Sequence, residues 1–286
     1  MPLAVLEFKV MKRFSSSPKA IVDSFARNRR LLYDLAKRDA IGRYKGSVFG
    51  ILWSLLTPLL MLTVYTFVFS EVFKARWGGA GASAGDSKTA FAIVLFAGMI
   101  VFNIFGECVS RAPGVVLGHS NYVTKIIFPL ELLPVVNLLS ALFHACISFA
   151  VLLVFELVER GSIPLTVFWL PFVLLPLSLL TLGVTWWLSA TGVFVRDIGQ
   201  TIGIFITALM FLSPVFFSLD SLPPRFRLIA HLNPLAFPIE QARNVLVFGT
   251  PIEWTKWLIY VAATSVIAWL GFAWFQRVRK GFADVI

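Results

Sequence analysis

The sequence predicts an all-α polytopic membrane protein with six transmembrane helices. Of its 286 residues, 58% are hydrophobic and only 14% are charged, and the mean hydropathy is +0.84. A soluble domain of this length needs far more polar surface. The charged residues cluster between apolar runs, several of them as long as the roughly 20 residues that a helix needs to cross a bilayer. Lipid is therefore the expected solvent for most of the chain.

Six apolar runs are long enough to be spans, and they are separated by polar or proline-rich segments. They lie at residues 49–73, 90–110, 132–155, 173–194, 201–219 and 257–275. Proline fixes the backbone and interrupts helical hydrogen bonding, so Pro164, Pro171 and Pro176 predict an interfacial approach and a kink at the fourth span. The fifth span is the shortest and is expected to be bent near Pro214.

The distribution of basic residues predicts the orientation of these spans. With six spans, one side of the membrane holds 17 Lys and Arg residues and the other holds 8. Cytoplasmic loops collect Lys and Arg, so both termini are expected in the cytoplasm and the protein in the inner membrane. The predicted organisation is a cytoplasmic segment over 1–48, a transmembrane domain over 49–275, and a cytoplasmic tail over 276–286. Residues 1–48 lack the apolar core of a cleavable signal, so the first span is expected to act as an uncleaved anchor.

Three segments outside the spans have a distinct character. Residues 20–43 form a basic amphipathic pattern, which is typical of a helix lying in the membrane interface. The Gly- and Ala-rich residues 78–87 predict a flexible external loop. Residues 220–256 alternate prolines with short apolar patches, too polar to span and too apolar for free solvent. We expect short re-entrant external helices there.

Several kinds of chemistry are not supported by the sequence. It contains no G-x-x-x-x-G-K-[ST] loop for nucleotide phosphates, no G-x-S-x-G, no H-E-x-x-H and no C-x-x-C. Cys108 and Cys146 lie within apolar segments without metal-ligand spacing, so neither a disulfide nor a metal site is expected. The net charge of +10 follows from basic cytoplasmic loops and does not indicate nucleic-acid binding. Mid-membrane carboxylates are scarce and no inverted repeat is visible, which argues against an ion-coupled transporter.

Few polar side chains fall within the predicted spans. Asn103, Glu107 and Arg111 follow one another at four-residue spacing, which fits either a substrate contact or, as we favour, a local ion pair at the interface. Asn137 and His144 are expected to hydrogen-bond to neighbouring helices rather than to a ligand.

Five stretches together resemble the ABC-2 type polysaccharide-export permeases, the transmembrane subunits of O-antigen and teichoic-acid exporters. They are 43-RYKGSVFGILWSLLTPLLMLTVYTFVF-69, 119-HSNYVTKIIFPLELLPVVNLLSAL-142, 192-GVFVRDIG-199, 211-FLSPVFF-217 and 232-LNPLAFPIEQAR-243. Each stretch alone is weak evidence, but all five occur in the family order. The resemblance covers residues 27 to 275.

The resemblance implies a transport subunit without its own nucleotide site or enzymatic activity. Two copies of the chain would pair as a homodimer, and two copies of a separate cytoplasmic ABC ATPase would bind the ATP and Mg²⁺. It also implies that the 119–131 loop holds a coupling helix seated on the ATPase. The expected contacts with the ATPase are Tyr122, Lys125, Phe128, Pro129, Arg196 and Asp197. For Arg196 and Asp197, a local salt bridge at a helix end is an equal alternative.

The implied cargo is a long glycan on a polyprenyl diphosphate, most closely O-antigen. Its anionic head would dock on Arg38, Arg43 and Lys45, because guanidinium groups bind phosphate bidentately. Ordinary anchoring to anionic lipid headgroups is the alternative for these three cations. At the opposite end, Arg225, Arg227 and Arg243 are expected at the rim of the external cap. Two other functions remain open, namely an ABC-2 exporter of another lipid or drug, and a membrane-embedded glycan-modifying enzyme using His144.

Overall fold

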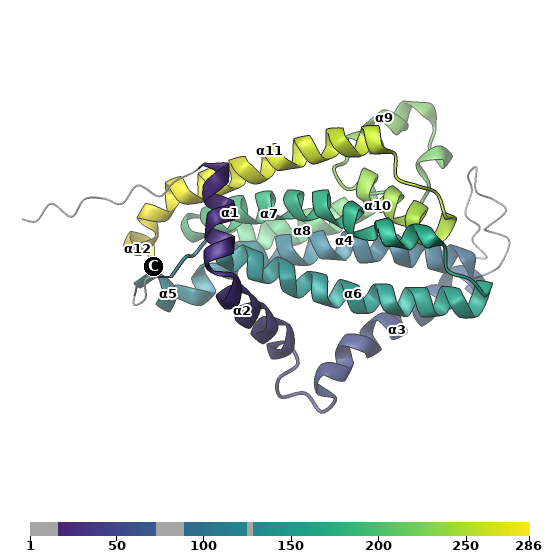
Figure 1. The fold of residues 1–286 in the computed structure, drawn as a ribbon, viewed down its shortest axis with the longest axis horizontal. Coiled ribbons are helices and arrows are strands. Elements are labelled where there is room, and N and C mark those ends of the chain that lie inside the picture. Colours follow the sequence, from purple (N-terminus) through teal and green to yellow (C-terminus); the bar gives the residue numbers. More distant parts are fainter. Residues whose placement is uncertain (1–16, 73–88, 125–127) are drawn as a thin grey trace, which may run out of the picture.

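The protein is a bundle of long helices, as seen in a computed structural model that describes residues 17–72, 89–124 and 128–286. No strand occurs among these described residues. The long helices run side by side along the long axis in Figure 1, while the first two helices cross the bundle near one end. The α-helices of the described residues are α1 (Pro18–Arg27), α2 (Arg29–Gly42), α3 (Trp53–Tyr65), α4 (Ala90–Val115), α5 (Ser120–Thr124), α6 (Leu132–Arg160), α7 (Leu170–Phe194), α8 (Ile198–Leu212), α9 (Pro224–Leu232), α10 (Ala236–Arg243), α11 (Trp254–Val278) and α12 (Phe282–Val285).

Short 3₁₀ and π turns extend several of these helices. A 3₁₀ turn over Gly50–Leu52 precedes α3, and a π-helical stretch over Thr66–Val72 follows it. Another 3₁₀ turn, Leu165–Trp169, leads into α7, and the π-helical stretch Asn244–Phe248 continues α10. The remaining 3₁₀ turns are Leu117–His119, Leu219–Ser221 and Arg279–Gly281.

Five of the six predicted spans are long and apolar enough to cross a membrane. They are the segments Gly50–Phe69, Ala90–Val115, Leu132–Arg160, Leu165–Phe194 and Trp254–Val285. The predicted fifth span, 201–219, is wrong in its bounds, because the helix there is α8, with 15 residues ending at Leu212. At 1.5 Å per residue it is about 22 Å long, shorter than the roughly 30 Å of a bilayer core. A crossing by this segment stays a prediction.

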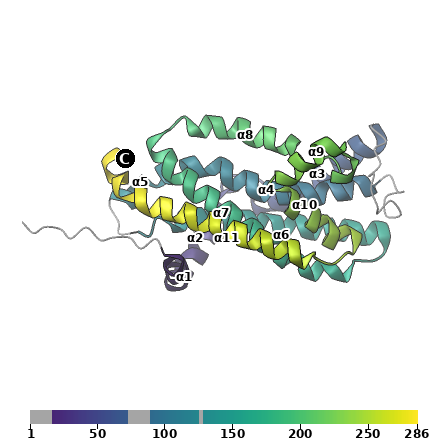
Figure 2. The same cartoon turned by 90° about the horizontal axis from the view of Figure 1, so that it is seen from above.

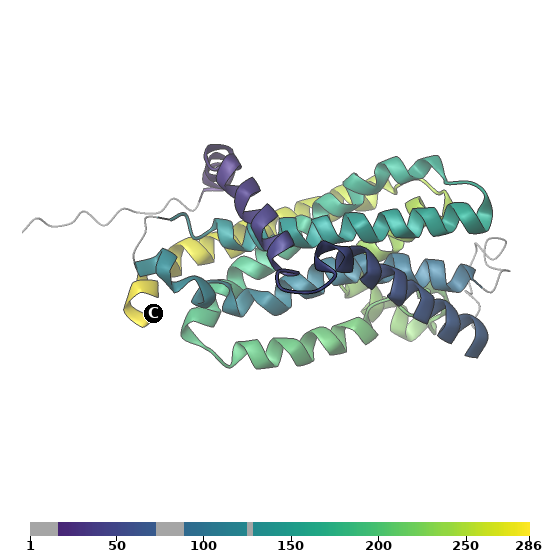
Figure 3. The same ribbon diagram turned by 90° about the horizontal axis from the view of Figure 1, so that it is seen from below.

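The core of the bundle is α4. Every residue from Ala90 to Phe102 is buried, because α6, α7, α8 and α10 all pack against this helix. By contrast, α8 has no buried residue and lies on one flank of the bundle in Figure 2. In Figure 3, α8 lies alongside α4 and α3 crosses obliquely in front of α4. The bundle therefore has a tightly packed centre and two helices with largely uncovered apolar faces.

The closest helix crossing joins α7 and α11. Gly183 of α7 lies against the backbone of Ile267, and Gly271 of α11 lies against the backbone of Gly183. Because neither glycine carries a Cβ, the two helices meet backbone to backbone. This contact fixes α11 onto α7 along the bundle.

The predicted amphipathic helix over 20–43 is two helices rather than one. Asn28 ends α1, because its backbone angles (φ −105°, ψ 18°) are not helical. Its side-chain Nδ2 also donates to the backbone oxygen of Ser24, 2.8 Å away. The chain then restarts as α2, which packs on α6 with Leu32 and Ala40 buried.

The two ends of the bundle differ in content. One end collects α1, α5, α12 and the C-terminus, and the other collects α9 and α10 (Figure 1). The predicted tail over 276–286 is folded, because Phe282 is fully buried against Phe194 and Phe275. The predicted external loop over 78–87 lies outside the described residues.

Candidate functional site

A cavity of about 810 Å³ lies between α2 and the bundle, near the end that carries α5. Its walls come from α2, α4, α6 and the segment that leads into α5. Most of the residues that line it are charged or polar. The lining includes Arg38, Asp39, Arg43, Lys45, Glu107, Arg111, His119, Tyr122 and Asn137.

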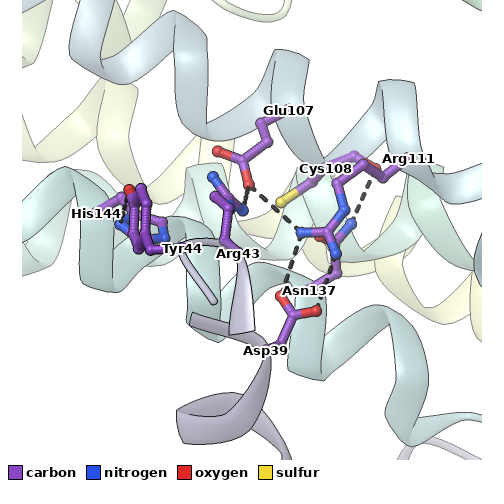
Figure 4. A network of polar contacts seen from close by, with 8 residues as sticks. All are labelled: Asp39, Arg43, Tyr44, Glu107, Cys108, Arg111, Asn137 and His144. Carbon is purple, nitrogen blue, oxygen red and sulfur yellow. Dashed lines mark hydrogen bonds and ion pairs between the residues drawn. The ribbon is translucent and has the colours of Figure 1, made fainter. Parts of the chain in front are cut away.

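Four charged side chains of alternating sign join α2 to α4 along this cavity (Figure 4). Arg43 pairs with Glu107 in a very short contact. Arg111 lies 3.6 Å from the same carboxylate and donates to both oxygens of Asp39, at 2.9 and 3.2 Å. We call Asp39, Arg111, Glu107 and Arg43 the charge chain. The local Glu107–Arg111 pair that the sequence predicted is thus one link of a contact between two helices.

The charge chain shifts the ionisation of the groups on the α2 side. Burial alone would raise the pKa of Asp39, but the hydrogen bond and charge of Arg111 hold that pKa below its ordinary value. Burial would likewise lower the pKa of Arg43, and Glu107 instead raises it. Both groups therefore stay charged at neutral pH, because each has an opposite charge in contact.

The cations predicted to hold an anionic head are brought together at this cavity. Arg38 and Lys45 line its mouth, and both also line a second cavity of about 580 Å³ at the elbow between α2 and α3, beside Ile41 and Ile51. Arg38 lies 3.4 Å from the Tyr122 hydroxyl. Arg43, in contrast, is paired with the carboxylate of Glu107.

His144 lies at a neighbouring cavity of about 490 Å³ among α3, α4, α6 and α8. Its Nδ1 is 3.4 Å from the Tyr44 hydroxyl (Figure 4). Asn137 donates to the backbone oxygen of Cys108 at 3.2 Å. The Asn137 contact confirms the predicted bond to a neighbouring helix, α4, whereas the partner of His144 lies in the turn between α2 and α3. Asn103 also lines this cavity and is exposed.

The predicted coupling segment contains a short helix, α5, held by stacked rings. His119 stacks on Tyr122 at 5.4 Å, and Tyr122 stacks on Phe128 at 4.5 Å. Phe128 is only 9% exposed and its ring packs the loop, so its contact with the ATPase stays a prediction. Pro129 is half-buried. Lys125 lies outside the described residues.

The turn between α7 and α8 also lies at this end of the bundle (Figure 2). Arg196 and Asp197 in this turn are both exposed. Their side chains are therefore accessible at the end where α5 is found, and their contact with the ATPase stays a prediction.

At the opposite end, the three predicted rim arginines have different environments. Arg225 and Arg227 on α9 are exposed, and Arg227 donates to the backbone oxygens of Leu222 and Asp220 at 2.9 and 2.7 Å. The rim position of Arg243 is wrong, because this side chain is 2% exposed. It donates to the backbone oxygens of Val94, Pro214 and Val215, at 3.0, 2.5 and 2.5 Å. Arg243 thus ties α10 to α4 and to the segment after α8.

Sequence reasoning missed two groups at the first end of the bundle. Asp39 looked like one acid on a basic helix, yet it closes the charge chain. Glu131 looked like a loop carboxylate beside α6, yet it is buried and paired with Arg279. No local sequence signal marks either residue, because each partner lies more than 70 positions away.

Comparisons with known proteins cover nearly the whole chain. The family model described as ABC-2 type transporter matches residues 30–247. The O-antigen export system permease protein RfbA of Klebsiella pneumoniae is 23% identical over 257 residues, 90% of this chain and 95% of the relative. The Myxococcus xanthus protein of the same name is 25% identical over 261 residues, 90% and 96% of the two chains. The capsule polysaccharide export inner-membrane protein CtrC of Neisseria meningitidis serogroup B is 23% identical over 271 residues, 91% and 95% of the two chains.

Proposed function

We propose that this chain, which belongs to the ABC-2 type transporter family, is the membrane permease of an ATP-driven exporter of lipid-linked polysaccharide. The expected cargo is O-antigen on a polyprenyl diphosphate. The observation that carries this proposal is the similarity to O-antigen export permeases over 90% of the chain. The chain acts as a transport subunit and performs no covalent chemistry of its own.

The energy would come from a separate ABC ATPase, two copies of which bind ATP and Mg²⁺. We expect this ATPase to bind the permease at the end of the bundle that carries α5, where His119, Tyr122, Arg196 and Asp197 lie. Binding there would place both termini of the chain in the cytoplasm. The exposure of Arg196 and Asp197 supports this seat. Helices α3 and α8 would pair two permeases into a homodimer in the inner membrane, which is supported by the absence of any buried residue on α8.

The diphosphate head would dock between the cavity of about 810 Å³ beside α2 and the cavity of about 580 Å³ at the α2–α3 elbow. Arg38 and Lys45 line both cavities there, and exposed apolar side chains of the elbow, such as Val48 and Phe49, would accommodate the lipid. A diphosphate that reaches Arg43 has to compete with Glu107 for that guanidinium. The planar guanidinium group of arginine suits such an exchange, because it binds carboxylate and phosphate groups with the same pair of hydrogen bonds.

Transport then follows a two-state cycle. Closure of the ATPase dimer pushes α5 and parts the spans along the permease dimer, and the glycan threads between them while its lipid changes leaflet. A movement at one end of the bundle would be transmitted to the other end because α7 and α11 are in close backbone contact at Gly183 and Gly271.

Deleting the gene in its host and restoring it on a plasmid tests the cargo. The expected result is loss of surface polysaccharide with lipid-linked glycan accumulating inside the cell, both reversed by the plasmid. Normal surface polysaccharide after deletion would contradict the proposal and favour export of another lipid or a drug. A glycan that still reaches the surface but lacks a substituent would favour the glycan-modifying enzyme.

A further inference from the structure

The buried residue Glu131 joins segments from four parts of the chain, its own included. Its Oε1 accepts from the Ser24 hydroxyl of α1 at 3.0 Å, and its Oε2 accepts from Arg279 beyond α11 at 2.6 Å. Its backbone oxygen accepts from the indole nitrogen of Trp186 on α7 at 2.9 Å. The Glu131 side chain is 9% exposed and that of Arg279 is 13% exposed, so these contacts form in a site largely shielded from water.

Arg279 holds the coupling loop at a second point. Its Nη2 donates to the backbone oxygen of Phe128 at 2.8 Å, while its Nη1 holds Glu131. One guanidinium thereby fixes the stretch from residue 128 to residue 131, directly after the segment that contains α5. The fixed geometry of the guanidinium fork makes such a two-point clamp rigid.

The groups around this clamp belong to the long helices of the core. The ring of Trp186 is 1% exposed and packs edge-on against Phe272 of α11 at 5.2 Å. It also stacks with Phe25 of α1 at 6.3 Å. Beyond Arg279, Phe282 is buried against Phe194 at the end of α7. A displacement of the loop at residues 128–131 therefore acts directly on α7, α11 and α1.

We infer that Glu131 and Arg279 are positioning residues that transmit movement of the coupling loop to α7 and α11. The inference rests on the proposed function, since it takes the ATPase as the source of that movement. The pair is suited to this role because a buried ion pair in a low-dielectric site resists separation, whereas an exposed pair exchanges readily with water. With the clamp intact, α5, the loop and the ends of both helices move as one body.

The test uses the full chain with its ATPase, reconstituted in liposomes. The exposed Cys146 is changed to Ser, and the exposed Thr255, at the end of α11 far from Arg279, is changed to Cys. The rate at which a polar maleimide labels this cysteine is measured with and without ATP and vanadate. We expect an ATP-dependent change in that rate in the parent chain. Glu131→Gln should copurify with the ATPase in equal amounts and lose the change.

Two further variants separate transmission from folding. Arg279→Lys keeps the charge but not the two-point clamp, so it should also lose the ATP-dependent change while the complex stays assembled. Asp284→Asn neutralises an exposed carboxylate on α12 and should behave as the parent. An ATP-dependent change that persists in assembled Glu131→Gln and Arg279→Lys, or that is missing from the parent, would overturn the inference. A parent chain that binds no ATPase would instead defeat the proposed function.

Discussion

The backbone of Gly271 lies so close to that of Gly183 that a Cβ on Gly271 would be 2.0 Å from the Gly183 carbonyl oxygen. No side chain can give way at this contact, because the atom in conflict is backbone. The crossing of α7 and α11 thus depends on both glycines. Membrane helices use small residues in this way, since close packing replaces the hydrophobic effect as the main source of association.

Gly271→Ala is expected to destabilise the protein by about 1–3 kcal/mol or more, because the two helices have to separate to admit the methyl group. Thermal unfolding in detergent measures the effect. Gly203→Ala is the matched control, since nothing lies within 4 Å of a Cβ there. Alanine favours a helix over glycine by about 1 kcal/mol, so the control should unfold at the same or a higher temperature. Equal unfolding temperatures for Gly271→Ala and the parent would disprove the close crossing.

Arg43→Ala is expected to lower export about tenfold or more, in line with the loss of charge-assisted hydrogen bonds to the diphosphate, while the ATPase stays bound. The variant also leaves Glu107 without its partner on α2. Adding Glu107→Gln to this variant distinguishes loss of the phosphate contact from the effect of an unpaired Glu107. The second change removes the unpaired negative charge of Glu107 without restoring the positive charge of Arg43. We expect the double variant to remain defective and Arg29→Ala, on the exposed face of α2, to export normally. Normal export by Arg43→Ala would exclude the head-group role.

Asp39 gives the stability of the α2 contact a defined pH dependence. Its pKa in the folded protein lies below the ordinary value, so its contribution is fully present above the unfolded pKa of about 4. The contribution is lost as the pH falls through the folded pKa. Asp39→Asn should therefore lower the unfolding temperature at pH 7 and the difference should shrink below pH 4. A difference that is constant between pH 7 and pH 3 would show that the ionised carboxylate is not responsible.

The spans were predictable from the sequence because each depends on a local property, the length of an apolar run. Five of the six predicted runs are helices long enough to span, and the largest shift is at the last one, which ends at Val285 and not at residue 275. The break at Asn28 was not predictable in this way, since the basic and apolar periodicity continues across it. It lies at Asn28, whose backbone leaves the helical conformation, and the helical pattern has no signal for this change.

The site was predictable only in part, for a related reason. Arg38, Arg43 and Lys45 lie close together in the sequence and share one cavity. Arg243 follows a proline-rich, partly polar stretch that resembles a surface, and only the long-range approach of α4 and residues 214–215 makes its site a buried one. Glu131 likewise gains its partners from α1, α7 and the C-terminal segment.

Arg243→Lys is expected to be strongly destabilising, although it keeps the positive charge. A lysine cannot reach three carbonyls of two separate segments, and each buried carbonyl left without a donor costs about 1–3 kcal/mol. Arg227→Lys is the control, because its two carbonyl partners lie at an exposed site where water replaces the bonds. Protease resistance and thermal unfolding of purified protein compare the two. A stable Arg243→Lys would refute the anchoring of α10 through this side chain.

The central claim, that this chain is the membrane half of an ATP-driven exporter, is tested most directly by purifying the tagged protein in mild detergent with its chromosomal neighbours expressed. We expect a soluble chain with a Walker A motif to copurify at equal stoichiometry, and to be lost when the exposed His119, directly before α5, and the exposed Asn121, within α5, are both changed to Glu. A pure permease that brings no ATPase, under conditions that keep known exporters intact, would contradict the claim.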